Sequence, residues 1–477
     1  MSAQRVTRRH LLRLAGVGLA GLTAAACAPK VVEVTKVVEK LVKETVVQEK
    51  LVKETVVQEK VVKETVVVEK KQPTPAPAKF DVVHWADFFL TTTDAKYKPY
   101  QDAVVKSFKD KFPNATPKFE DHGWDDGLRQ NLVTALLAGT GPDVIVGENY
   151  FQQYADMGAM VPIDDMIQDI KDNLVPGTIK AAVTKNGTYG LSERTGVFGF
   201  ERSPSLIERA GIDPTTPPKT WDELLDHCQK ITKVGKGKFF GYTLQGPMGW
   251  PLAGIFRMSV YIGQCGASLC KDDCTYPSYN DPKAEQALTF LREINKYTPP
   301  GLTFNPDEGQ VYQQMYKGVT AYQICGSWHT GNKMDEGLKP ALYSIVPLPK
   351  DGKPTALVVG NSINGVLTVS KHKVEAITLC KVIVEDAIQD MVYPVFNLLP
   401  TIKSALQRLL PKVKEADKAF VNTLLTANVE VLPQWRKDPQ KLWQAYDDML
   451  VKLFTTNQPV KQLMEEAQQA AEAIMKA

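Results

Sequence analysis

The chain has 477 residues, of which 43% are hydrophobic and 23% are charged. This length exceeds what one hydrophobic core supports and is typical of two or three domains. The formal net charge is only +3, and part of the basic excess lies near the N-terminus, which argues against a nucleic-acid partner.

Residues 1–26 are predicted to be an export signal. Arg8 and Arg9 precede a Gly/Ala-rich apolar run at 14–26, which is too short to cross a bilayer at about 20 residues per crossing. The run ends in small residues directly before Cys27. This pattern resembles the twin-arginine signal and lipobox of bacterial lipoproteins, which implies cleavage before Cys27 and acylation of its thiol. An ordinary signal peptide with a coincidental cysteine is the alternative.

Residues 27–79 are predicted to form a lipid anchor, a repetitive stalk and a proline-rich linker. The sequence LVKETVVQEK occurs at 41–50 and again at 51–60, with a variant at 61–70 and a degenerate copy at 31–40. Its apolar pairs recur every five residues, so neither a helix nor a strand keeps them on one face. The conformation of this stalk is therefore left open, with a coiled-coil oligomerisation segment as the main alternative. The QPTPAPA sequence that follows is typical of a stiff, extended linker.

Residues 80–477 alternate strand and helix patterns, which predicts a parallel α/β sheet. A second series of strands and helices begins near Thr188. Thr220 is a natural helix N-cap with Glu223 three residues later, the spacing of a capping box. Strands are expected at 80–85, 115–119 and 143–146, and helices at 100–112, 128–137 and 150–160.

Six cysteines remain after Cys27. Cys265, Cys270 and Cys274 lie close together in a Gly/Asp/Ser-rich loop, where a local disulfide is expected in an extracytoplasmic protein. Their spacing differs from the paired pattern of zinc sites and no histidine is near, so neither a metal site nor a cofactor is predicted. The pairing among all six, which also include Cys228, Cys325 and Cys380, stays open.

An ordered series of short motifs runs through the globular part. They are AGTGPDVI (138–145), ADMGAMVP (155–162), NGTYG (186–190), AGID (210–213), PPKTWDE (217–223), GVTA (318–321), GSW (326–328) and PLP (347–349). In this order they resemble family 1 extracellular solute-binding proteins of bacterial ABC importers, in the maltose and multiple-sugar branch.

The resemblance implies a periplasmic-binding-protein-like α/β fold of two lobes, which bind a ligand in their cleft and close on it by a hinge. It places the chain crossings between the lobes near 193–199 and 356–366. The expected parts are 80–194 in the first lobe, 195–358 in the second, 359–400 back in the first, and 401–477 as C-terminal helices mainly in the second.

A sugar ligand needs flat aromatic rings for its C–H face, and carboxylates, amides or a guanidinium group for its hydroxyls. Trp328 follows a predicted strand and is the preferred stacking residue over a core role. Trp85 and Asp87 end the first strand, where ligands of open α/β sheets collect, although Trp85 fits the core nearly as well. The other candidates are Trp124, Glu148, Asn149, Glu193 and Arg194 after later strands, Met248 in a family ligand loop, and Asn361 in the second crossing.

Trp124 and the Glu148–Asn149 pair also fit solvated loops, and Glu193 with Arg194 fits a simple ion pair.

From the signal, the stalk and the family resemblance together, we predict a lipid-anchored protein on the outer face of the cell membrane. It delivers a sugar or oligosaccharide to the transmembrane subunits of an ABC permease. A polyamine or another small polar solute is the alternative ligand, and a stalk-presented sensor the alternative role.

An enzyme is not expected from the sequence. Glu148 and Glu193 can be cast as the two carboxylates of a glycoside hydrolase. No nucleophile elbow, HExxH motif or phosphate loop accompanies them.

Overall fold

The structure is a computed structural model, and it describes residues 35–42, 60–67, 78–247, 253–271, 274–330, 332–359 and 361–477. The chain divides into two compact units, Met1–Pro77 and Ala78–Ala477. The predicted signal and Cys27 lie outside the described residues. No helix in the described ranges is both long and apolar enough to span a membrane.

Two segments of the predicted stalk form strands, β1 (Thr35–Val42) and β2 (Lys60–Val67). They pair antiparallel, with Thr35 opposite Val67 and Val42 opposite Lys60. These two segments are extended, so the coiled-coil alternative does not describe them.

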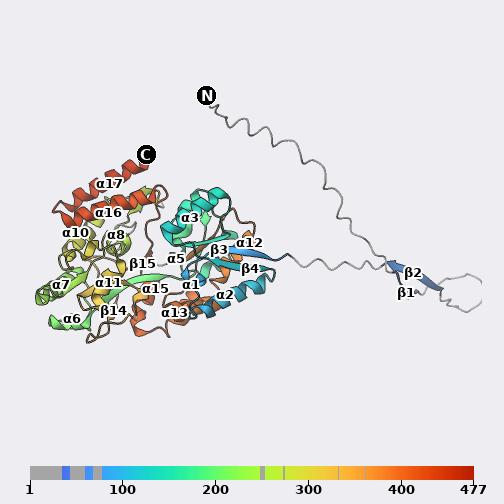
Figure 1. The fold of residues 1–477 in the computed structure, drawn as a ribbon, viewed down its shortest axis with the longest axis horizontal. Coiled ribbons are helices and arrows are strands. Elements are labelled where there is room, and N and C mark those ends of the chain that lie inside the picture. The colour runs from blue at the N-terminus through green and yellow to red at the C-terminus, as the bar shows by residue number, and fades with distance from the viewer. Residues whose placement is uncertain are drawn as a thin grey trace, which may run out of the picture. The chain divides into compact units, whose positions relative to one another are not determined.

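The first lobe of the second unit contains β3 (Phe80–Trp85), β4 (Ala115–Glu120), β5 (Val144–Gly147), β8 (Leu191–Ser192) and β16 (Ile363–Val366) (Figure 1). The strand order is β4-β3-β5-β16-β8, and β3 pairs in parallel with both β4 and β5. β16 runs antiparallel to β5, with Ile363 opposite Gly147. The predicted parallel sheet is therefore correct for the first three strands and wrong for β16, because β16 enters this lobe from the second lobe.

The helices of the first lobe include α1 (Phe88–Thr91), α2 (Lys98–Lys111), α3 (Asp125–Ala138), α4 (Phe151–Asp156), α5 (Pro176–Ile179), α12 (Lys373–Val382), α13 (Asp386–Phe396) and α14 (Lys403–Leu409). α2 buries Tyr100, Val104 and Phe108 on one side, as its apolar spacing predicts. α4 is shorter than the predicted helix at 150–160. It ends early because Gly158 adopts a left-handed φ of 69°, which terminates helices.

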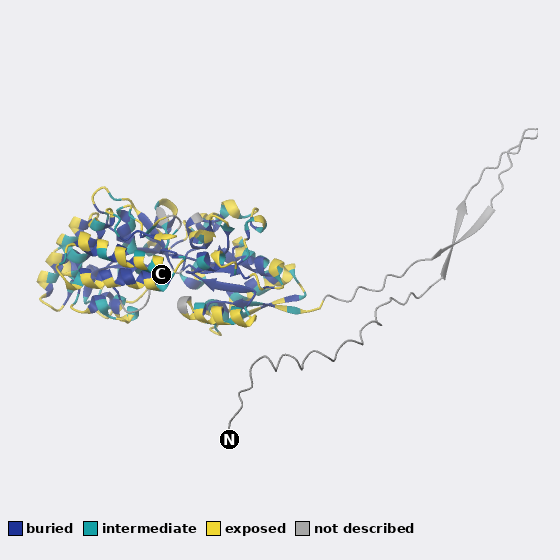
Figure 2. Ribbon diagram, turned by 90° about the horizontal axis from the view of Figure 1, so that it is seen from above, coloured by how far each residue is buried: buried dark blue, intermediate teal, exposed yellow. Residues whose placement is uncertain are grey.

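The second lobe contains β9 (Gly196–Arg202), β10 (Phe240–Thr243), β13 (Thr320–Gly326), β14 (Leu342–Ser344), β15 (Thr355–Val359) and β17 (Asn428–Glu430). Its strand order is β10-β13-β9-β15-β17, and β14 pairs with β9. Buried residues fill the interior of each lobe, and exposed residues lie on the outer helices (Figure 2). The helices of this lobe include α6 (Pro204–Arg209), α7 (Trp221–Gly235), α8 (Ala253–Phe256), α9 (Ser259–Gln264), α10 (Ala284–Asn295), α11 (Glu308–Tyr316), α15 (Lys418–Thr426), α16 (Pro439–Thr455) and α17 (Val460–Lys476).

The described part of the chain crosses between the lobes three times, and the first two crossings lie within the segments that the resemblance implies. The chain leaves the first sheet after β8 and enters the second at β9, and it returns between β15 and β16. These two crossings run side by side, since Val358 lies opposite Val197 on one side and Ile363 opposite Ser192 on the other. The chain enters the second lobe for the last time between α14, which contacts α13, and α15, which packs on β9.

A disulfide closes a short loop of the second lobe. It joins Cys270 to Cys274, next to the strand pair β11 (Cys270–Lys271) and β12 (Tyr276–Pro277). The expected local disulfide is thus confirmed. Among the described residues the free cysteines are Cys228, Cys265, Cys325 and Cys380.

The capping box at α7 provides a test of a sequence-derived contact. The Thr220 side chain accepts a hydrogen bond from the Glu223 amide, and the Glu223 carboxylate accepts from the Thr220 amide. We expect Thr220→Ala to lower the free energy of unfolding by about 1 kcal/mol in urea titrations, because it leaves the Glu223 amide without its hydrogen-bond acceptor.

Thr378→Ala is the matched control for this variant, because Thr378 is a half-buried residue inside α12, away from the helix ends. Alanine has the higher helix propensity there, so stability should not fall. Equal effects of the two substitutions would contradict the capping role of Thr220.

Candidate functional site

A cavity of about 810 Å³ lies between the two lobes. Its walls come from loops at the strand ends of the first lobe, from the first crossing, and from helices and loops of the second lobe. The lining residues are Asp87, Phe88, Phe89, Asp121, Gly123, Trp124, Glu148, Asn149, Arg194, Phe256, Glu308, Trp328, Leu398 and Leu432.

Trp328 lies in the short 3₁₀ helix η5 (Ser327–His329) directly after β13, and it is half-buried. Its ring rests against the backbone of the two neighbouring strands β9 and β13. A Cβ atom at Gly196 would lie 2.6 Å from the ring, and one at Gly326 would also collide with it. The two glycines therefore hold one side of the ring, and the rest of the side chain lines the cavity.

Aromatic side chains of the first lobe also line the cavity. Phe88 is 56% exposed and Trp124 is 36% exposed, which is unusual for rings of this size. Phe88 begins α1, and Trp124 directly precedes α3 after Gly123, which has a positive φ of 88°. The second lobe adds Phe256 at the end of α8. Both lobes thus present ring surface to the same space.

A buried ion pair connects the segment after β3 to the first two crossings. Asp87 accepts hydrogen bonds from the Phe89 amide at 2.9 Å and from the Ser362 hydroxyl at 3.0 Å. The same carboxylate lies 2.5 Å from an Arg194 guanidinium nitrogen. The guanidinium group also lies over the rings of Phe89 and Phe396, at 4.3 and 5.6 Å from their centroids. Arg194 is therefore held on several sides at the edge of the cavity.

Glu193 lies behind Arg194 and is fully buried. Its carboxylate accepts a hydrogen bond from the Tyr100 hydroxyl and lies 3.3 Å from Arg194. The pKa of Glu193 is raised to about 7, first by burial and then by the Asp87 carboxylate, against the opposing effect of Arg194. The structure places Glu193 in the hinge, outside the cavity lining.

The polar lining contains further hydrogen-bonding groups. Asn149 accepts a hydrogen bond from Gln434 Nε2 at 2.9 Å, and its own Nδ2 is buried without a hydrogen-bond partner among the described residues. Glu308, in the first turn of α11, lies 2.8 Å from Arg257. Asp121 accepts from the Gly123 amide at 2.9 Å. A ligand in this cavity meets donors and acceptors on both lobes.

The structure brings six of the predicted residues together in the lining: Asp87, Trp124, Glu148, Asn149, Arg194 and Trp328. Trp85 is 7% exposed and stacks on His122 with ring centroids 3.8 Å apart. Asn361 is buried in the second crossing, where it accepts from Ser192 and donates to the Thr178 carbonyl. Met248 lies outside the described residues.

Eight residues of the lining were not predicted from the sequence: Phe88, Phe89, Asp121, Gly123, Phe256, Glu308, Leu398 and Leu432. Phe88 and Phe89 directly follow Asp87, so the strand-end argument could have included them. Asp121 belongs to the loop that carries Trp124. Phe256 and Glu308 lie on second-lobe helices, and no local pattern marks them.

The chain belongs to the bacterial extracellular solute-binding protein family, whose model matches residues 91–390. It is 26% identical over 293 residues to an uncharacterised ABC transporter extracellular-binding protein of Pyrococcus horikoshii, covering 58% of this chain and 63% of that protein. It is 24% identical over 229 residues to a maltotriose-binding protein of Pyrococcus abyssi, covering 47% of this chain and 46% of that protein. The matches thus span about half to two thirds of these relatives.

Solved structures show the same two-lobe fold. The cyclic α-maltosyl-1,6-maltose binding protein from Arthrobacter globiformis superposes with a TM-score of 0.70 at 19% identity, covering 84% of this chain and 100% of that chain. The predicted periplasmic-binding-protein-like fold and the family resemblance are therefore confirmed.

The raised pKa of Glu193 gives a pH prediction. Folding raises the pKa of Glu193 from 4.5 to about 7, so the native state binds the proton more tightly than the unfolded chain. This stabilises the native state fully below about pH 4.5, and the stabilisation is lost as the pH rises through about 7. We expect Glu193→Gln, which stays neutral, to gain roughly 3 kcal/mol of stability relative to the wild type between about pH 4 and pH 8. Urea unfolding of both proteins across this range measures the difference, and parallel pH profiles would contradict it.

Proposed function

We propose that this protein is the solute-binding component of an ABC importer and captures a sugar or oligosaccharide between its lobes. The observation that carries the proposal is the cavity lining, which combines aromatic rings from both lobes with hydrogen-bonding side chains. The family match and the names of the relatives support the same role.

The lining fits the chemistry of a sugar. Trp328 and Trp124 offer flat apolar faces to the C–H side of a pyranose ring, and carboxylates and amides bind its hydroxyls. The buried Nδ2 of Asn149 is an available donor to a ligand oxygen. The volume of about 810 Å³ lies in the range of small-molecule sites, roughly 300–1,000 Å³.

A polyamine is the second candidate ligand, because four carboxylates line the cavity against one guanidinium group. Two of these carboxylates, Asp87 and Glu308, are paired with Arg194 and Arg257. Their charge is therefore compensated, which favours a neutral ligand over a cation.

Thermal-shift screening separates the two ligand classes. The panel contains maltotriose, other neutral oligosaccharides and spermidine. A ligand at about 100 times its dissociation constant stabilises the native state by roughly 2.7 kcal/mol. Stabilisation by oligosaccharides alone supports the proposal, whereas stabilisation by spermidine alone would replace it with the polyamine function.

Trp328 is the residue on which the carbohydrate proposal depends most. We expect Trp328→Ala to weaken oligosaccharide binding by about 2–4 kcal/mol, because the ligand loses a stacking surface. The cost in folding stability should stay below the 3–5 kcal/mol of a fully buried tryptophan, because the residue is half-buried. Calorimetric affinity and the urea midpoint are measured on the same variant.

Trp221→Phe is the matched control. Trp221 is 4% exposed, stacks on Phe290 at 4.2 Å, and donates from its indole nitrogen to Gln264 and to the Pro347 carbonyl. Its substitution should reduce stability without a change in affinity. A stability loss with near-normal affinity at Trp328 would contradict the stacking role.

The lipid anchor is part of the proposed function. Cys27 follows a signal-like segment and precedes the repetitive stalk. We expect Cys27→Ser to move the protein from the membrane fraction to the soluble fraction, with unchanged thermal stability of the globular unit. Retention of the variant in the membrane fraction would contradict acylation at Cys27 and leave an ordinary signal peptide.

A further inference from the structure

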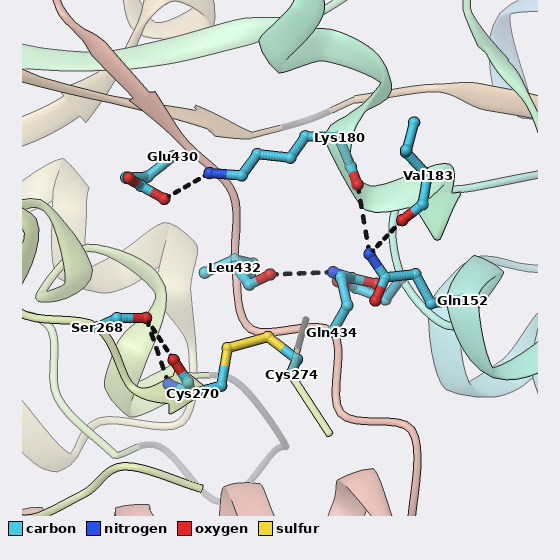
Figure 3. The surroundings of a disulfide bond; sticks show 10 residues. Gln152, Lys180, Val183, Ser268, Cys270, Cys274, Glu430, Leu432 and Gln434 are labelled. Carbon is cyan, nitrogen blue, oxygen red and sulfur yellow. Dashed lines mark hydrogen bonds and ion pairs between the residues drawn. A yellow bond between two sulfur atoms is a disulfide. The ribbon is translucent and has the colours of Figure 1, made fainter. Parts of the chain in front are cut away.

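A second cavity, of about 330 Å³, lies between the disulfide loop of the second lobe, first-lobe residues around Gln152 and Lys180, and the segment 430–434. Figure 3 shows the Cys270–Cys274 disulfide on one side of this space, with the two glutamines and the Lys180–Glu430 ion pair around it. We propose that this cavity is a separate binding site for one small neutral hydroxylated unit, a polyol or a monosaccharide.

Two buried amides carry the proposal. Gln152 is 8% exposed, and its Nε2 donates to the Val183 carbonyl at 2.9 Å and to the Lys180 carbonyl at 3.3 Å. These two bonds fix the orientation of the amide, because only the nitrogen can donate. Gln152 Oε1 is left buried without a hydrogen-bond partner among the described residues.

Gln434, in the segment 430–434, has the same arrangement. It is 4% exposed, and its Nε2 donates to the Leu432 carbonyl at 3.1 Å and to Asn149 Oδ1 at 2.9 Å. Gln434 Oε1 is likewise buried without a partner in the described part of the chain. Buried acceptors are normally satisfied, so two in the lining of one cavity indicate a ligand that donates hydrogen bonds.

The remaining lining defines the class of this ligand. The walls combine polar groups with apolar side chains, among them Val183, Ile262 and Leu357. The charged groups are Lys180 and Glu430, which lie 2.8 Å apart with side chains 48% and 39% exposed. Their charges compensate each other at the rim, so a buried cation would find no carboxylate of its own. A neutral molecule with hydroxyl donors and an apolar face satisfies both glutamines.

Hydroxyl donors can reach this cavity from two sources. One is a free monosaccharide or polyol. The other is the end of a longer oligosaccharide held in the larger cavity, since Leu432 lines both cavities and Gln434 of one is bonded to Asn149 of the other. Only the second source depends on the proposed sugar binding in the larger cavity.

The test uses the full chain and three variants. Ala267→Trp fills the second cavity, in whose lining Ala267 lies, and Gln152→Leu removes one acceptor at similar volume. Ala470→Trp, at an exposed position of α17, is the matched control for the added ring. Thermal unfolding first verifies that each variant is folded. Ala267→Trp and Gln152→Leu each test the cavity independently. If one of them does not fold, the other still decides the result.

Equilibrium dialysis with glycerol, glucose and mannose tests the free source. We expect one of these probes to bind the wild type and the Ala470→Trp control, with affinity at least tenfold weaker in Gln152→Leu and lost in Ala267→Trp. Calorimetry with maltotriose and maltohexaose tests the other source. There, maltohexaose should bind at least tenfold more tightly than maltotriose, and Ala267→Trp should abolish this gain.

Either pattern supports the second site. No binding of the three small probes together with equal affinities for the two oligosaccharides would overturn it and leave a cavity that holds only water. Small-probe or maltohexaose binding that Ala267→Trp and Gln152→Leu leave unchanged would overturn it as well. If neither oligosaccharide binds, the result counts against the proposed function. The existence of the second site is then decided only by the binding of glycerol, glucose or mannose.

Discussion

The buried ion pair between Asp87 and Arg194 is the contact on which the arrangement of the lobes depends. Asp87 lies just after β3, Arg194 lies in the first crossing, and Ser362 of the second crossing bonds to the same carboxylate. Three separate chain segments therefore meet at one charge. Removing one partner of such a pair leaves the other charge buried and costs about 3–5 kcal/mol, so the segments are strongly coupled.

This coupling also limits what Arg194 can do in the cavity. Its guanidinium group is bonded to Asp87 and Glu193 and lies over two phenylalanine rings. A group held on so many sides cannot swing to follow a ligand. Adaptation to different ligands then falls to the more exposed residues, above all Phe88 and Trp124.

Local sequence patterns predicted the first-lobe strands and several cavity residues. Asp87, Glu148 and Asn149 follow strand ends, and the carboxyl ends of parallel strands meet at one edge of a sheet. The same argument misjudged Trp85, because this residue is still inside β3 and faces His122. Phe256 and Glu308 could not be found, since their place in the cavity depends on how one lobe faces the other. The reversed direction of β16 likewise follows from the return of the chain and not from its own residues.

The interleaving of the two lobes has a consequence for biosynthesis. The first sheet lacks the strand between β5 and β8 until residues 363–366 have left the ribosome, and the second lacks β17 until residues 428–430 follow. Domains usually fold as units during synthesis, beginning from the N-terminus. Neither lobe can do so here, because each nascent sheet keeps an unpaired edge over most of translation. Such edges pair readily with other chains, so the protein depends on protection from aggregation until nearly all of it has been made.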